Sequence, residues 1–255
     1  MTRTRILQVG LAIVLPIALV ASWLVLSRDS TNVYFPPLSE ILTKFRELWI
    51  FDLVPLHVVP SLTSIAAGMG ISIVLGIGLG LLFGLSRRLS AAVQPILFFF
   101  RALPTVALLP MFIVLLGIGL EMRIAVIIAG ALWPILMNTI DGVRNVDATV
   151  LDTGRMYQIR GRHRLFSVVL PSAAPQIFAG IRTSLSVSVI VMVASELVGS
   201  TRGIGYFILS AQRQFMIPDL WAGLILLGLI GYLLNVLFVV VERRMLAWHT
   251  GSRAS

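Results

Sequence analysis

The sequence predicts an all-α, polytopic membrane protein with six transmembrane helices and with both termini in the cytoplasm. Hydrophobic residues make up 58% of the 255 residues and charged residues only 12%, with a mean hydropathy of +0.97. A soluble domain carries about 25% charged residues. The apolar residues gather in six runs, most of them near the length of about 20 residues that a helix needs to cross a bilayer. Arginine and lysine gather in alternate loops, which favours one orientation.

The six runs give the expected spans, which cover residues 7–27, 62–86, 92–116, 123–141, 177–199 and 220–241. The first run follows a short basic N-terminus and could be a signal peptide. Its apolar stretch, 6–26, is longer than a typical signal core, and no small-x-small cleavage pattern follows. We therefore expect it to be retained as the first span.

The distribution of basic residues sets the predicted orientation. With the N-terminus inside, twelve basic residues are cytoplasmic: Arg3, Arg5, Arg87, Arg88, Arg144, Arg155, Arg160, Arg162, Arg164, Arg243, Arg244 and Arg253. Six are outside, namely Arg28, Lys44, Arg46, Arg123, Arg202 and Arg213, while Arg101 and Arg182 fall near or within spans. The excess of basic residues belongs on the cytoplasmic side, so both termini are predicted to be there.

Small residues and prolines predict how the spans pack. In the second span a small residue recurs every four positions, at Gly68, Ser72, Gly76, Gly80 and Gly84. Such a ridge lets a neighbouring helix approach closely. The third span contains Pro95, Pro104 and Pro110, and the fourth contains Pro134. Because proline leaves backbone carbonyls unpaired, these helices are expected to be buried in protein or to line a wet cavity, although a kink can serve packing alone.

The fifth span carries a polar stripe and one acidic residue. Ser184, Ser188, Ser195 and Gly199 fall within about 60° of one another on a helical wheel. Their hydroxyls could line a passage or could hydrogen-bond to neighbouring helices. Glu196 is a functional candidate because it is ionisable within a span, or it could cap a local structure at the outer interface. Arg182 is too far along the same helix to pair with it.

Several classes of function have no support in the sequence. The net charge of +9 is explained by loop arginines, so nucleic acid is not an expected partner. There is no cysteine, and His57, His163 and His249 lack metal-ligand spacing, so no metal site is expected and solvated or interfacial roles are favoured. The chain has a single lysine and no Gly-Lys-Ser/Thr sequence, which excludes a P-loop. No catalytic constellation is visible, so the chain is not expected to be an enzyme.

The loop 142–176 between the fourth and fifth spans is long, polar and rich in arginine. Asp147 is a plausible N-cap for a helix over about 148–157, with Val150, Leu151 and Met156 as apolar contacts. A second short helix is expected from about 162 to 169. Pro171 and Pro175 are expected to end it and to mark the start of the fifth span. Topology alone does not need a loop of this length, so we expect a docking element.

This loop and its neighbours resemble the permease subunits of bacterial ATP-binding-cassette importers of the nitrate, sulfonate and taurine branch. The family signature reads Glu-Ala-Ala, three residues, Gly, nine residues, then Ile-x-Leu-Pro. Anchored on Leu170-Pro171, it puts its acidic position at Asp152, its second alanine at Gly154 and its glycine at Gln158. Further similar fragments are 35–39, 84–88, 101–104, 109–110, 133–139, 142–144, 196 and 203–206. The likeness covers roughly residues 35–245.

The resemblance implies partners and a division of labour. Such a permease pairs with a second copy, docks its cytoplasmic loops on two ATPase subunits that bind ATP and Mg, and receives solute from a periplasmic or lipid-anchored binding protein. The coupling residues implied are Asp147, Val150, Leu151, Asp152, Arg155, Gln158, Gly161, Arg162, Arg164, Leu170 and Pro171. Because Gln158 replaces the glycine that turns the chain, we expect Gly161 to provide the turn.

The remaining assignments follow the same resemblance and the polar residues of the spans. The translocation pathway is expected to include Arg101, Pro104, Asn138, Ser184, Ser188, Ser195 and Glu196. Candidates for contact with the binding protein, or for an outer gate, are Arg202, Tyr206, Arg213 and Gln214. The chain divides into the first span and periplasmic segment (1–60), the permease core (61–242) and a cytoplasmic tail (243–255). The alternative is an ion-coupled secondary transporter or channel. The sequence shows neither a convincing internal repeat nor the intramembrane charge pairs expected for ion coupling, and both observations disfavour this alternative.

Overall fold

The computed structural model describes residues 3–247, and the side chains of residues 14–50 and 52–247. These residues form helices without a strand. The α-helices are α1 (Arg3–Leu26), α2 (Leu38–Glu47), α3 (Val59–Leu85), α4 (Arg87–Ala102), α5 (Leu109–Leu116), α6 (Leu120–Arg144), α7 (Ala148–Met156), α8 (Gly161–Arg164), α9 (Leu170–Gly199), α10 (Ile204–Arg213) and α11 (Ile217–Met245). Short π-helical turns, η1 (Leu48–Asp52), η2 (Val54–Val58) and η4 (Leu165–Val169), and a 3-10 turn, η3 (Thr105–Leu108), connect some of them.

Four continuous helical segments in the described part are long and apolar enough to cross a membrane. They are Val54–Leu85, Leu120–Arg144, Gly161–Gly199 and Ile217–Met245. A fifth passage results if the bent pair Arg87–Ala102 and Thr105–Leu116 counts as one span. The expected first span falls on α1, whose described apolar stretch is Val14–Leu26. The all-α membrane fold is therefore confirmed.

The expected third span is not one helix. The helices on either side of Leu103 and Pro104 are bent by 82°. Leu103 precedes a proline and adopts an extended backbone, with φ −72° and ψ 125°, because the proline ring disfavours the helical region for the residue before it. Pro104 itself, with ψ 113°, is also outside the helical region. The span predicted over 92–116 is thus corrected to two helices joined at this bend.

The start of the fifth span also differs from the prediction. A separate helix over 162–169 was expected to end before Pro171, but the segment Gly161–Gly199 is helical throughout. Leu170 donates to the carbonyl of Leu165, five residues back, in the π-helical turn η4. Pro171 directly follows this π-helical turn and, having no N–H, cannot donate to a carbonyl one turn earlier. The polar loop is therefore shorter than predicted, since α6 continues to Arg144 and helix resumes at Gly161.

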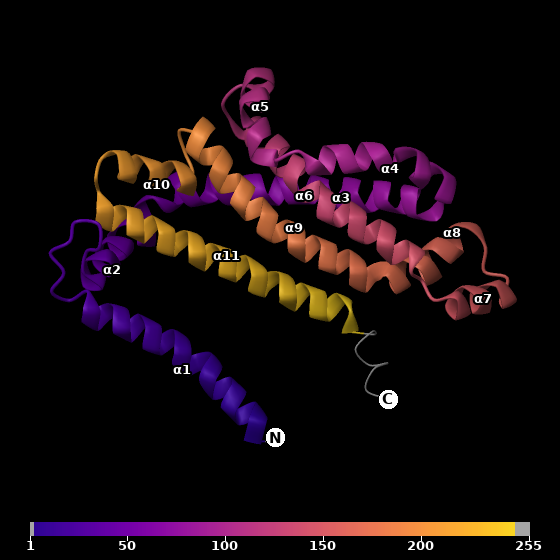
Figure 1. The fold of residues 1–255 in the computed structure, drawn as a ribbon, viewed down its shortest axis with the longest axis horizontal. Coiled ribbons are helices and arrows are strands. Elements are labelled where there is room, and N and C mark those ends of the chain that lie inside the picture. The colour runs from indigo at the N-terminus through magenta and orange to yellow at the C-terminus, as the bar shows by residue number, and fades with distance from the viewer. Residues whose placement is uncertain (1–2, 248–255) are drawn as a thin grey trace.

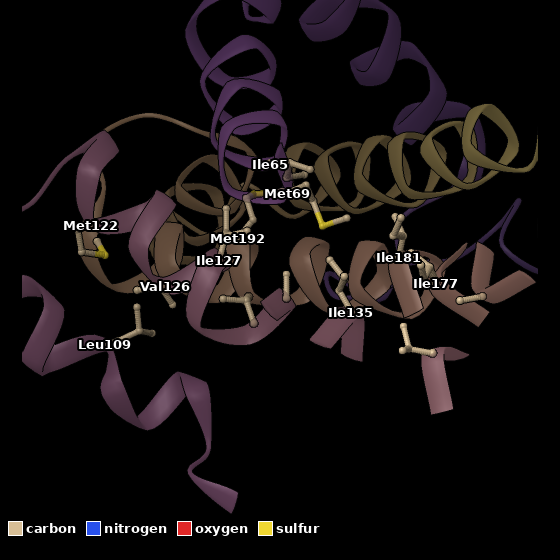
Figure 2. Packing of buried hydrophobic residues seen from close by; sticks show 14 of the residues in the cluster. Ile65, Met69, Leu109, Met122, Val126, Ile127, Ile135, Ile177, Ile181 and Met192 are labelled. Atoms are coloured by element: carbon tan, nitrogen blue, oxygen red, sulfur yellow. The ribbon is translucent and has the colours of Figure 1, made fainter. Parts of the chain in front are cut away.

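The helices α3, α6 and α9 pack side by side along the long axis of the molecule (Figure 1). Side chains from all three form the main core, shown in Figure 2, where Met69, Ile127 and Met192 lie close together. Ile177 and Ile181, in the first half of α9, extend this core along the helix (Figure 2). These three packed helices connect the segments at the two ends of the molecule.

The small-residue ridge of α3 makes the predicted close contact, and its partner is α6. A Cβ atom added to Gly68 would lie 2.5 Å from Ile127 Cγ2, and one added to Gly80 would lie 2.5 Å from Thr139 Cβ. Gly76 and Gly84 meet α6 in the same way. Glycine is required because any side chain at these positions would hold the two helices apart.

The two ends of the bundle carry different structures. Helices α2 and α10 lie at one end and α7 and α8 at the other (Figure 1). The Arg3 end of α1 and the Met245 end of α11 both point away from the α2–α10 end. We refer below to the α10 end and the α7 end. Arg253, His249 and most of the predicted tail 243–255 lie outside the described residues.

Candidate functional site

The predicted docking element at the α7 end is a short, capped helix. The carboxylate of Asp147 accepts a hydrogen bond from the backbone N–H of Thr149 at 2.7 Å, which confirms Asp147 as the N-cap of α7. Leu151 packs against the main core. Val150 and Met156 are 43% and 84% exposed. Leu151 therefore anchors α7 to the bundle, while the other two apolar side chains are free to meet a partner.

The turn after α7 uses both residues considered for it. Gln158 has φ +55° and Gly161 has φ +57°. The N–H of Ile159 donates to the carbonyl of Gly154, and the N–H of Gln158 donates to that of Arg155, each at 2.9 Å. This pair of bonds is a Schellman motif, which places the residue after the C-cap in the left-handed conformation. Gly161 adopts a left-handed conformation, as expected for a turn, but Gln158 adopts it as well, against the expectation that it would avoid this strained backbone.

The charged residues of this segment are mostly exposed. Arg155 and Asp152 form an exposed ion pair of 2.7 Å on α7. Arg162 is exposed and Arg164 is half-buried on α8. Leu170 and Pro171 lie in the first turn of α9 rather than at a break in the chain. Gly154 stands at a position where a Cβ atom would meet Val168 at an ordinary 3.6 Å, so alanine would also fit there.

Two of the predicted pathway residues lie around one cavity between α4 and α6. Arg101 and Asn138 line a cavity of about 440 Å³, together with Thr105 and Asp141. Pro134 also lines it and has no N–H to donate, so the carbonyl of Gly130, one turn earlier, has no helical partner. Pro104 lies at the bend between Arg101 and Thr105. The cavity therefore combines the Arg101 guanidinium and the Asp141 carboxylate with hydroxyl and amide groups.

The serines of the fifth span do not lie around this cavity. Ser184, Ser188 and Ser195 are fully buried. Ser184 Oγ donates to the carbonyl of Ala131 on α6 at 2.5 Å. Ser188 and Ser195 donate to carbonyls of their own helix, each at 2.7 Å. Only the bond of Ser184 reaches a neighbouring helix, as the packing alternative expects, whereas Ser188 and Ser195 bond within α9.

Glu196 is fully buried at the α10 end and holds several segments together. Its Oε1 accepts hydrogen bonds from Ser61 Oγ at 2.7 Å and from Arg123 Nη1 at 3.2 Å. Its Oε2 accepts from the backbone N–H of Gly205 at 2.9 Å. The N–H of Ile204 donates to Ser61 Oγ at 3.0 Å. Glu196 and Ser61 therefore cap the N-terminus of α10, which confirms the local capping role considered for Glu196.

The glycines of the same connector make room for this carboxylate. Gly203 has φ +117°, and a Cβ atom on it would lie 2.3 Å from Glu196 Cδ. A Cβ atom on Gly205 would lie 2.8 Å from the carbonyl of Val193. His57 Nδ1 lies 3.1 Å from the carbonyl oxygen of Gly203. We name Ser61, Arg123, Glu196, Gly203 and Gly205, with His57, the Glu196 network.

The network corrects two expectations. Charge pairs between spans were not expected, yet Arg123 of α6 pairs with Glu196 of α9, and Arg182 of α9 pairs with Glu242 of α11. His57 was expected to be solvated or interfacial but is buried. Sequence spacing could not reveal the Arg123 pair, because its partner lies on another helix. The sequence did contain one hint of this network: His57 and Ser61 are four residues apart and so lie on one helical face.

The four candidates for contact with a binding protein all lie at the α10 end. Arg202 is exposed in the connector before α10, and Tyr206 stacks on His57 with a centroid distance of 6.2 Å. Arg213 lines a cavity of about 530 Å³ with Phe215 and Trp221. Gln214 donates to Ser210 Oγ at 2.8 Å. Within residues 3–247, no group of three or more His, Asp and Glu side chains could hold a metal ion.

Comparison with protein families decides the class of the chain. Residues 72–247 match the family described as binding-protein-dependent transport system inner membrane component. The chain belongs to this family. The resemblance inferred from the loop and the scattered fragments is thereby confirmed, and we call the protein the permease.

Individual relatives agree with this assignment. The permease is 32% identical over 239 residues to the putative aliphatic sulfonates transport permease protein SsuC of Bacillus subtilis, covering 92% of this chain and 86% of the relative. It is 28% identical over 253 residues to the taurine transport system permease protein TauC of Escherichia coli, with coverage of 95% and 90%. It is 35% identical over 189 residues to the bicarbonate transport system permease protein CmpB of Synechococcus elongatus, with coverage of 74% and 68%.

The fold also has a solved counterpart. A chain of the inward-facing MetNI methionine ABC transporter superposes with a TM-score of 0.64 at 20% sequence identity, covering 74% of the permease and 94% of that chain. At this identity the likeness concerns the fold alone. The permease therefore shares its helical fold with a chain of that transporter.

Proposed function

We propose that the permease forms the pathway of an ATP-driven importer for a small anionic solute, delivered by a periplasmic or lipid-anchored binding protein. Relatives carry names for the transport of sulfonates, taurine, bicarbonate and nitrate. The observation that supports an anionic solute in this chain is the cavity between α4 and α6, where Arg101 has no ion-pair partner within the described residues. The guanidinium of Arg101 can bind an oxyanion through charge-assisted hydrogen bonds, while the carboxylate of Asp141 in the same lining reduces the net positive charge of the cavity.

The two ends of the bundle support a division into an outer and an inner side. We propose six spans in the bacterial inner membrane, with both termini and α7 in the cytoplasm and α2 and α10 on the periplasmic side. The Arg3 end of α1 and the Met245 end of α11 lie on the side away from α10 (Figure 1). The basic residues Arg144, Arg155, Arg160, Arg162 and Arg164 also gather at the α7 end. The binding protein would then meet Arg202, Tyr206, Arg213 and Gln214.

The exposed apolar residues of α7 support docking on a separate ATPase subunit. Met156 and Tyr157, at the end of α7, are 84% and 78% exposed, and Val150 is 43% exposed. Two copies of the permease would carry two ATPase subunits, which bind ATP and Mg, so this chain itself is not the enzyme. Closure of the ATPase pair would move α7. Because α8, η4 and α9 form one continuous helical segment that starts soon after α7, the movement would reach α9.

Co-purification of the permease with its ATPase tests the docking. Met156→Asp should abolish co-purification, because a charge in an apolar contact loses its solvation without gaining a partner. Phe215→Asp is the matched control, since Phe215 is 71% exposed at the opposite end of the bundle. Equal recovery of the ATPase with both variants would contradict docking through α7.

The ion-coupled alternative has one observation in its favour, the buried pair of Arg123 and Glu196. Ionisable groups inside spans often serve ion coupling. Here, however, the carboxylate also caps α10 and has Ser61 and Gly205 as further partners. Uptake into vesicles separates the two mechanisms. Uptake that requires enclosed ATP and survives an ionophore supports the importer, whereas uptake that follows an ion gradient without ATP supports the alternative.

A further inference from the structure

Four arginine side chains from four segments line one cavity at the α7 end. Arg87 begins α4, Arg144 ends α6, Arg155 lies on α7 and Arg164 ends α8. The cavity has a volume of about 770 Å³ and also touches Leu85 at the end of α3. No aspartate or glutamate lines it. We call it the arginine cavity.

The positive charge of the arginine cavity is poorly compensated. Arg155 pairs with Asp152, and both of these side chains are about two-thirds exposed. Arg87, Arg144 and Arg164 form no ion pair within residues 3–247. The Nε atom of Arg164 is buried and has no hydrogen-bond acceptor. Arg87, Arg144 and Arg155 are exposed, so solvent screens much of their mutual repulsion, whereas the buried Nε of Arg164 without an acceptor carries a desolvation cost that a bound anion would offset.

The first turn of α4 adds to the same effect. A helix N-terminus carries a partial positive charge and favours an anion. In α4 this turn contains Arg87 and no acidic residue, and the Ser86 hydroxyl caps only the N–H of Leu89. A negative group in the cavity would therefore lower the energy of both the guanidinium groups and the helix end.

We propose that the arginine cavity binds an oxyanion of phosphate or sulfonate type, supplied by the headgroup of an anionic phospholipid or by a free anion in solution. The planar guanidinium matches the paired oxygens of such groups. A volume of about 770 Å³ lies within the range of small-molecule sites and accommodates a phosphate ester with its waters. Leu85, Ala91, Val143, Leu151 and Val169 contribute apolar side chains to the wall.

A bound oxyanion would fix α7 relative to the long helices. Arg155 belongs to α7, whereas Arg87 and Arg144 belong to α4 and α6. An anion between them replaces repulsion with charge-assisted hydrogen bonds. Occupancy of the cavity would thereby stiffen the connection between the docking helix and the membrane helices. Binding there does not depend on which solute the permease carries.

Two arms of one binding experiment distinguish the sources of the anion, using the full-length permease. In the first arm, the delipidated protein in neutral detergent is titrated with sodium sulfate or phosphate, against sodium chloride at equal ionic strength, and the melting temperature is followed. In the second arm, native mass spectrometry counts phosphatidylglycerol retained from mixed vesicles of phosphatidylglycerol and phosphatidylcholine. A saturable response in the first arm supports a free anion, and selective retention in the second supports a lipid headgroup.

The variant Arg87→Gln/Arg164→Gln should weaken the observed binding at least tenfold. The control Arg160→Gln/Arg243→Gln removes the same charge from exposed residues that do not line the cavity and should stay within twofold of the parent. If the first variant does not fold, Arg144→Gln should still weaken binding at least threefold. Equal losses in variant and control, no response in either arm, or displacement of the anion by added ATPase would each overturn the proposal.

Discussion

The guanidinium of Arg123 donates to the carboxylate of Glu196 at 3.2 Å, although 73 residues separate them in the chain. Arg123 lies in the first turn of α6 and Glu196 near the end of α9, so the pair joins two long helices at the α10 end. The same carboxylate caps α10. With Ser61 of α3 as a further donor, one side chain thus joins four helices, α3, α6, α9 and α10.

Replacing Glu196 with alanine should lower the stability of the permease by about 3–5 kcal/mol, because it leaves the buried Arg123 without a counterion. Thermal unfolding in detergent measures the change. Glu47→Ala is the control, since it removes an exposed partner of Lys44, and should leave the melting temperature unchanged. Equal melting temperatures for both variants would show that the buried pair does not hold the helices together.

Gly80→Ala should destabilise the contact between α3 and α6 by about 1–3 kcal/mol, the usual cost of overpacking. The added methyl group would lie 2.5 Å from Thr139 Cβ and 3.1 Å from the carbonyl of Leu136. Gly78→Ala on the same helix has nothing within 4 Å, and should be neutral or stabilising through helix propensity. A melting temperature that falls in both variants would contradict the predicted face of α3.

Gln158→Gly should stabilise the end of α7 by up to about 1 kcal/mol. A left-handed residue other than glycine costs about 1–2 kcal/mol in the folded state. The greater freedom of glycine in the unfolded chain offsets part of the stability gained by removing this strain. Hydrogen exchange of the α7 amides should slow in this variant. Gln158→Ala keeps the strained backbone and should show no slowing, so slower exchange in the alanine variant as well would rule out the backbone explanation.

Gly161→Val should uncouple solute uptake from ATP hydrolysis in the assembled importer. No atom lies within 4 Å of the position where a Cβ would stand, so the effect arises from the φ of +57°, which a β-branched residue does not adopt. Gly161→Asn tolerates this conformation and should retain uptake. The measurement is uptake per ATP hydrolysed in vesicles, and full coupling in the valine variant would place the essential turn elsewhere.

Arg101→Gln should reduce uptake of an anionic solute at least tenfold without changing the melting temperature. The side chain is exposed in the cavity between α4 and α6, so its loss removes an attraction for the solute rather than a structural contact. Arg46→Gln on α2, also exposed, should transport normally. Parallel losses in both variants would indicate a general effect of charge.

The arrangement of local features followed from the sequence. The capping of α7 by Asp147 depends on residues two positions apart, and the glycine ridge of α3 depends on a four-residue repeat. Hydropathy located each long apolar helix because a bilayer imposes its thickness on every span. Pro104 in the sequence predicts a break in the helix, but it does not predict the angle of 82° between the two helices.

Only the tertiary structure determined which helix each feature meets. The glycine repeat does not identify the helix that packs against α3. That this helix is α6 depends on complementary shapes along both helices. The pairing of Glu196 with Arg123, and the meeting of four arginines in one cavity, depend on how helices distant in the chain come together. Sequence fixes short-range geometry through covalent connectivity, whereas contacts between helices arise from packing of the whole bundle.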